Sequence, residues 1–177
     1  MHRLLRFLAI MALLVATGCS RRAGPNEVPA PTKLDIWQAV QPRAQRYGMD
    51  PAFIYALVAA ESNFDPAARN ADARGLLQIK PAAWRTVSQL PYEPNVWNWR
   101  ANLEAGIDYL AYSRSYLHQK TSFTYPKLLA AFHYGLDYVE ERRFDVERLP
   151  IPDNPIYREL WRGNLKPVAV PDLPSKD

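Results

Sequence analysis

One carboxylate continues the apolar face of a predicted helix near residue 60. The i, i+3, i+4 and i+7 positions of a single helix face are occupied by Ile54, Leu57, Val58 and Glu61. A carboxylate on such a face loses hydration, and in the last helical turn it also meets the negative end of the helix dipole. Both effects favour the neutral acid, which is the form that a general acid needs near neutral pH.

The same spacing is compatible with a structural role for this glutamate. Glu61 would then rotate to the rim of the domain or pair with an arginine such as Arg69 or Arg74. Both interpretations stay open on periodicity alone, and the motifs that follow favour the functional one.

Four short motifs follow in order along the chain. Residues 61–66 read Glu-Ser-Asn-Phe-Asp-Pro, and residues 75–81 read Gly-Leu-Leu-Gln-Ile-Lys-Pro. Residues 102–110 read Asn-Leu-Glu-Ala-Gly-Ile-Asp-Tyr-Leu, and residues 130–135 read Ala-Ala-Phe-His-Tyr-Gly. In order and spacing, the sequence between about residues 36 and 161 resembles the catalytic domain of lytic transglycosylases of the soluble, goose-lysozyme-like (SLT) type.

The resemblance implies a fold, a reaction and a set of site residues. It implies an all-α, lysozyme-like (SLT-type) single domain that binds the glycan strands of peptidoglycan. Glu61 matches the single catalytic acid, which would cleave the β-1,4 bond after N-acetylmuramic acid (MurNAc) and leave a 1,6-anhydro sugar. Gly75 matches the glycine of the tight turn beside the site. The residues expected at the substrate groove are Ser62, Asn70, Gln78, Lys80, Phe132, His133 and Tyr157.

Several of these positions depart from the family pattern. Asn70 stands in place of a serine in a loop one residue short, and Lys80 replaces an apolar methionine or leucine. Phe132 replaces a tyrosine whose hydroxyl is expected beside the scissile sugar, and His133 replaces an asparagine. These changes leave open an impaired, glycan-binding lipoprotein. A hydrolytic muramidase is a second alternative, which would need another carboxylate; the nearest by sequence are Asp65, Asp72 and Asp153.

Other chemistries find little support in the composition. The three histidines are isolated in sequence and no Gly-x-Ser-x-Gly motif occurs, so we expect neither a metal nor a cofactor. The formal net charge is +4, and Lys and Arg occur in no run longer than a pair, which argues against a nucleic-acid partner. We expect a monomer.

The periodicity predicts helices throughout the domain and no strand. Pro42 is expected to kink or break the first helix. We expect Tyr109, Tyr112 and Tyr116 to serve mainly in packing, whereas Trp97 and Trp99 either stack on sugar rings or close over the core. The helices are predicted at 34–47, 51–63, 81–89, 102–118, 126–134, 136–144 and 155–161.

The N-terminal segment has the pattern of an exported lipoprotein. Residues 1–18 are basic, then apolar, then small, as in a secretory signal peptide. The run that ends at Cys19 resembles the lipobox of bacterial lipoproteins, which implies membrane attachment through lipidated Cys19, at the periplasmic face of the outer membrane if the source has one. We expect a linker at 19–33, the catalytic domain at 34–163 and a loose tail at 164–177.

Overall fold

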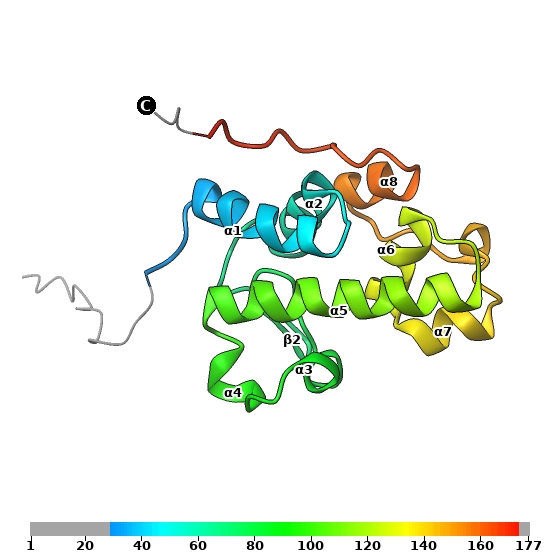
Figure 1. Cartoon of the computed structure of the whole chain (residues 1–177), viewed down its shortest axis with the longest axis horizontal. Coiled ribbons are helices and arrows are strands. Elements are labelled where there is room, and N and C mark those ends of the chain that lie inside the picture. Colours follow the sequence, from blue (N-terminus) through cyan, green and yellow to red (C-terminus); the bar gives the residue numbers. More distant parts are fainter. Residues whose placement is uncertain (1–28, 174–177) are drawn as a thin grey trace, which may run out of the picture.

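The computed structural model describes residues 29–173, and within them the regular secondary structure is almost all helical (Figure 1). The predicted signal peptide, Cys19 and most of the predicted linker lie outside the described residues. The elements are α1 (Lys33–Arg46), α2 (Pro51–Ser62), β1 (Arg69–Asn70), β2 (Ala73–Arg74), α3 (Pro81–Val87), α4 (Tyr92–Asn95), α5 (Trp99–Lys120), α6 (Tyr125–Tyr134), α7 (Leu136–Glu141), a 3-10 helix (Val146–Arg148) and α8 (Pro155–Trp161). The expected all-α class is confirmed.

The apolar helix α2 forms the centre of the core. Every residue from Ala52 to Ala59 is buried. The side chain of Asp50 accepts a hydrogen bond from the amide of Ala52, and Pro51 occupies the first turn, so the helix begins where the sequence predicts. Helices α1 and α8 pack against α2, and α5 packs against α1, α3 and α6 (Figure 1). The C-terminal turn of α2 is thereby held at a fixed place in the domain.

Pro42 lies inside α1 without ending it, so of the expected kink or break the break does not occur. The proline ring is exposed, while Ile36, Trp37, Val40 and Ala44 on the same helix are buried. The packing of that buried face compensates for the backbone hydrogen bond that proline cannot make.

Several other predicted boundaries shift because of local caps. Helix α5 starts earlier than expected, since the side chain of Asn98 accepts hydrogen bonds from two amides of its first turn. Helix α7 ends at Glu141 rather than near residue 144, because Arg143 and Phe144 have positive φ angles. The short hairpin of β1 and β2 forms the one sheet within residues 29–173. Strands of two residues are too short for an alternating pattern to predict them.

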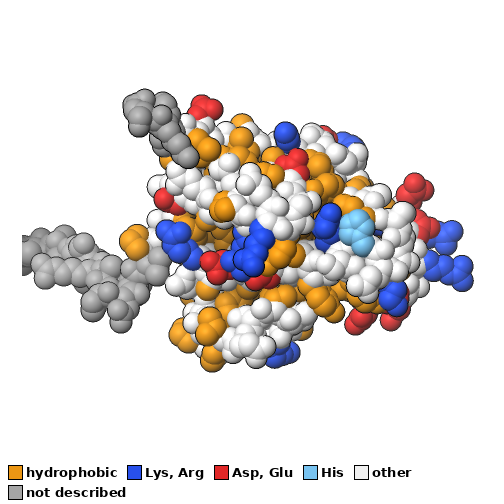
Figure 2. Space-filling model, in the orientation of Figure 1, with side chains coloured by type: hydrophobic (Ala, Val, Ile, Leu, Met, Phe, Trp, Pro, Cys, Tyr) orange, Lys and Arg blue, Asp and Glu red, His pale blue; other side chains and the backbone are white. Residues whose placement is uncertain are grey.

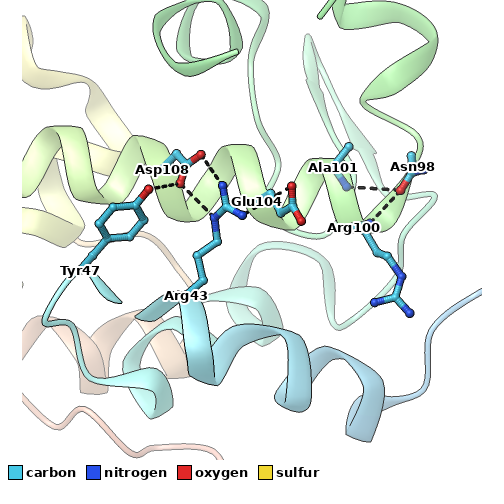
Figure 3. Close-up of polar contacts among 7 residues, drawn as sticks. All are labelled: Arg43, Tyr47, Asn98, Arg100, Ala101, Glu104 and Asp108. Carbon is cyan, nitrogen blue, oxygen red and sulfur yellow. Dashed lines mark hydrogen bonds and ion pairs between the residues drawn. The ribbon is translucent and has the colours of Figure 1, made fainter. Parts of the chain in front are cut away.

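A polar cluster joins α1 and the middle of α5 (Figure 3). Nε and Nη2 of Arg43 donate hydrogen bonds to the two carboxylate oxygens of Asp108, at 3.0 and 2.7 Å. The hydroxyl of Tyr47 donates to the same carboxylate at 2.8 Å, and Glu104 lies 3.5 Å from Arg43. The hydrogen bond to Asp108 raises the pKa of both Arg43 and Tyr47. These partly buried contacts fix α1 across α5.

The surface in Figure 2 carries Lys and Arg side chains interspersed with acidic and hydrophobic ones, without a continuous basic band. Past α8, Leu165 and Val168 are partly buried and pack against the core, so contacts with the domain continue beyond residue 163. Across residues 29–173, no helix has both the length and the apolar character needed to cross a membrane.

Candidate active site

Two of the sequence motifs fit together through glycines. Gly75 has a φ of +74°, and a Cβ atom there would lie 2.3 Å from Nδ2 of Asn102. Gly106 is equally confined, because a Cβ atom would lie 2.3 Å from Cδ1 of Leu77. The loop that begins at Gly75 therefore packs directly on α5, at distances that only glycine permits.

The buried side chain of Asn102 fastens the same loop by hydrogen bonds. Its Oδ1 accepts from the amide of Leu77 at 3.0 Å. Its Nδ2 donates to the carbonyls of Arg74 and Val96, at 2.9 and 3.1 Å. A fully buried amide that satisfies three backbone groups explains why asparagine stands at this position.

A cleft of about 490 Å³ lies beside this loop. Its lining residues come from the end of α2, the hairpin, the loop before α3, the first turn of α3, the middle of α5 and the end of α6. The lining residues are Glu61, Asn70, Ala71, Ala73, Gln78, Ile79, Lys80, Ala82, Ala83, Tyr109, Phe132, His133, Tyr134 and Gly135. Its size suits part of an oligosaccharide chain.

Glu61 lies in the last turn of α2, and it lines the cleft. The hydroxyl of Tyr157 donates a hydrogen bond to Oε1 of Glu61. Burial raises the pKa of Glu61 to about 7, although the hydrogen bond from Tyr157 and the charge of Lys80 act in the opposite direction. Near neutral pH this carboxyl group therefore exists in both forms, so it can give up a proton and take one back.

The structure does not support the pairing of Glu61 with a nearby arginine. Nη1 of Arg74 donates to the carbonyls of Ala71 and Ala73, at 2.8 and 2.9 Å. The guanidinium of Arg69 lies over the ring of Trp97, 4.3 Å from its centroid. The arginines thus have other partners, and the helix end carries a carboxylate whose hydrogen-bond partner is a tyrosine.

Gln78 combines a structural role with its place in the cleft wall. Its Nε2 donates to the carbonyl of Gly75 at 2.8 Å and to that of Ala68 at 3.1 Å. Its backbone has a φ of +45°, an uncommon value for a residue with a side chain. The side chain of Gln78 therefore stabilises the loop by bonding to two of its carbonyls, and it also lines the cleft.

Most of the predicted groove residues come together. Asn70, Gln78, Lys80, Phe132 and His133 all line the cleft with Glu61.

Two predicted groove residues do not line the cleft. The hydroxyl of Ser62 donates to the carbonyl of Val58 at 3.1 Å, within α2. Tyr157 is buried and contacts Glu61 from α8. It acts on the site through the carboxylate rather than as a groove residue.

Tyr109 is a cleft residue that the packing interpretation of its helix missed. It lines the cleft from α5, with its ring centroid 6.1 Å from that of Phe132 and 6.2 Å from that of Tyr112. Its place in the Asn-Leu-x-x-Gly-x-x-Tyr-Leu motif was the available signal. Of the two tryptophans, Trp99 is buried in the core and Trp97 packs under the Arg69 and Arg74 guanidinium groups.

No second carboxylate accompanies Glu61 among the described residues of the cleft wall. Asp65 caps its own turn through the amide of Ala67, and Asp72 is exposed outside the cleft. Asp153 is exposed and pairs with Arg158. Within residues 29–173, no three His, Cys, Asp or Glu side chains are grouped so as to hold a metal ion.

The comparison with known families agrees with this geometry. The model of the transglycosylase SLT domain matches residues 38–147, which is more than half of the chain and includes every lining residue of the cleft. No match to a curated protein was found. Because the matched region contains the four motifs and the elements that bring them together, the chain belongs to the transglycosylase SLT domain family.

Proposed function

We propose that this protein is a peptidoglycan lytic transglycosylase that uses Glu61 as its single catalytic acid and base. The observation that carries the proposal is that Glu61 is the one carboxylate among the described residues lining the cleft, and that its pKa is raised to about 7. Most glycosidases that add water or form a glycosyl enzyme use two carboxylates. One carboxyl group that exchanges its proton near neutral pH suits intramolecular closure of the sugar instead.

The proposed reaction has two proton transfers at the same group. Protonated Glu61 donates its proton to the oxygen that leaves C1 of MurNAc, and the N-acetyl group of the substrate stabilises the cationic centre. The resulting carboxylate then accepts the proton of the sugar's 6-hydroxyl, whose oxygen attacks C1. Glu61 ends protonated, the products are a free 4-hydroxyl and a 1,6-anhydroMurNAc end, and no water is consumed.

The digestion of purified sacculi distinguishes this proposal from its two alternatives. Residues 20–177, without the proposed anchoring cysteine, are incubated with sacculi, and the soluble products are analysed by mass. Anhydro ends support the transglycosylase. Reducing ends would support a muramidase, and intact sacculi that pellet with the protein would support an impaired, glycan-binding protein.

The variant Glu61→Gln assigns the reaction to the proposed residue. The amide keeps the size of the side chain and still accepts a hydrogen bond from Tyr157, but it cannot donate an acidic proton. We expect anhydro products to form about 10²- to 10⁴-fold more slowly, which is the contribution that general acid catalysis makes to the rate. Anhydro products at the parent rate would refute the mechanism.

We further propose that the chain is a lipoprotein, with acylated Cys19 anchoring the domain to the membrane that faces peptidoglycan. The support is the sequence pattern around Cys19. Mass spectrometry of the mature N-terminus tests it, with Cys19→Ser as the comparison. An unmodified Cys19 in a cleaved chain would refute the anchor while leaving the enzymatic proposal intact.

A further inference from the structure

Lys80 is a cation in the cleft wall without an acidic partner. No carboxylate within residues 29–173 lies at ion-pair distance from Lys80. Of the other described lysines, Lys120 pairs with Glu140 at 3.0 Å and Lys127 donates to the hydroxyl of Thr121 at 2.9 Å, whereas Lys33 and Lys166 have no ion pair but lie outside the cleft. The position of Lys80 therefore leaves its ammonium group available to a ligand in the cleft.

The backbone at position 80 is held in place on both sides. Ile79 pairs with Arg74, with the two N–H···O bonds at 3.0 and 3.2 Å, and its carbonyl also accepts from the hydroxyl of Tyr92 at 2.8 Å. On the other side, the carbonyl of Lys80 accepts from the amide of Trp84 in the first turn of α3. The lysine thus projects from a fixed part of the cleft wall.

His133 lines the same cleft at the end of α6. Its ring makes edge contacts with Tyr134 and with Tyr157, at centroid distances of 4.6 and 5.2 Å. Burial and the charge of Lys80 lower the pKa of His133, so near neutral pH its imidazole is uncharged and keeps one N–H donor. The two residues together offer one positive charge and one neutral hydrogen-bond donor.

The charge of the cleft favours an anionic ligand when the site is ready to react. Among the described lining residues, Glu61 is the one carboxylic acid and Lys80 is the one lysine or arginine. The proposed mechanism begins with Glu61 protonated. The reactive form of the cleft is then positive through Lys80.

We propose that Lys80 and His133 form a subsite for a carboxylate carried by the muramoyl residue of the glycan. This inference rests on the proposed action on peptidoglycan. Two sources share the chemistry. In glycan without peptides the lactyl ether of MurNAc ends in a free carboxylate, whereas in peptide-bearing glycan that group is an amide and the carboxylates belong to the stem peptide.

The test measures binding without turnover, in the mature chain carrying Glu61→Gln. The ligands are GlcNAc-MurNAc tetrasaccharides, prepared with or without stem peptides, and each is also prepared with its carboxylates converted to amides. Calorimetry gives the dissociation constants. The variants are Lys80→Met, which restores an apolar residue, Lys80→Arg, and the control Lys166→Met, which removes the same charge at an exposed position outside the cleft.

We expect the carboxylate form to bind about tenfold more tightly than its amide, which corresponds to about 1.4 kcal/mol, because only the carboxylate forms a charge-assisted hydrogen bond with Lys80. Lys80→Met should abolish this preference, and Lys80→Arg and Lys166→Met should retain it. A preference confined to peptide-free ligands identifies the lactyl carboxylate, and one confined to peptide-bearing ligands identifies the stem. Equal binding of carboxylate and amide, or a preference that survives Lys80→Met, would overturn the subsite.

The parallel digestion with unmodified Glu61 separates this inference from the proposed function. Cleavage to anhydro products without a carboxylate preference would refute the subsite alone. A preference that depends on Lys80, together with the absence of any cleavage, would refute the reaction and support the subsite.

Discussion

The hydroxyl of Tyr157 donates a hydrogen bond to Glu61, a residue 96 positions earlier in the chain. The packing of α8 on α2 brings the two side chains together. Burial, and then the neighbouring Glu61, raise the pKa of Tyr157 well above its ordinary value, so the phenol stays protonated and remains a donor. Tyr157 lies beyond the region matched by the family model, yet it contacts the proposed catalytic group directly.

Tyr157→Phe should change the pH dependence of the reaction. The hydrogen bond stabilises the carboxylate and lowers its pKa, so its loss raises the pKa of Glu61 further above the ordinary range. The alkaline limb of the profile of kcat/KM against pH, which reports loss of the acid's proton, should move to higher pH. The maximum rate should fall about tenfold, since the carboxyl group is positioned less firmly.

Tyr116→Phe provides the matched control for this substitution. Tyr116 also donates its hydroxyl to a glutamate, Glu140, but both residues lie outside the cleft. We expect the profile of this variant to coincide with that of the parent. An alkaline limb that stays in place in Tyr157→Phe would show that the hydrogen bond is absent from the reacting form.

Glu61 should make the domain less stable as the pH rises. Between the ordinary pKa of 4.5 and the raised value of about 7, the folded chain keeps a proton that the unfolded chain has lost. The contribution of Glu61 to the free energy of unfolding therefore falls with increasing pH over that window. Between pH 4.5 and 7, the free energy of unfolding of Glu61→Gln should therefore increase by about 2–3 kcal/mol relative to that of the parent.

Urea unfolding of both proteins at several pH values measures this difference. Glu147→Gln makes the same chemical change at an exposed position and supplies the baseline. A stability difference between Glu61→Gln and the parent that stays constant from pH 4.5 to 7 would contradict the burial of an ionisable carboxyl group at the end of α2.

Gly75→Ala should destabilise the domain more than Gly163→Ala does. Both glycines have positive φ angles, +74° and +89°, so each substitution carries backbone strain of about 1–2 kcal/mol. At Gly163 a Cβ atom would meet nothing within 4 Å, whereas at Gly75 it would collide with Asn102. The collision should cost about 1–3 kcal/mol more. Equal losses of unfolding free energy would show that the loop can move away from α5.

Phe132→Tyr should increase turnover. A tyrosine hydroxyl is expected beside the scissile sugar in this family, and Phe132 lines the cleft close to Tyr109. A new hydrogen bond made only in the transition state would raise kcat by about tenfold, which is less than the loss seen when an established donor is removed. Steady-state rates on soluble glycan measure the change. A rate that is unchanged or lower would mean that the groove has adapted to the phenyl ring.

The helices could be predicted from the sequence because capping residues and apolar periodicity are local features of the chain. Asp50 and Pro51 mark the start of α2, and its apolar composition matches a helix buried along its length. The short hairpin and the positive φ angles that end α7 have no comparable local pattern. Helix α1 continues through Pro42 because its opposite face is buried in the core. The local preference of proline to end a helix does not take that packing into account.

The sequence by itself determined that Glu61 extends an apolar helix face and that the motifs of this family surround it. Only the tertiary structure decided what lies around that carboxylate. It placed Tyr157 in hydrogen-bond contact, left Asp65, Asp72 and Asp153 outside the cleft, and brought Tyr109 into its wall. The physical reason is that the pKa of a carboxyl group depends on burial and on neighbours from distant parts of the chain, and only the folded arrangement of helices specifies those neighbours.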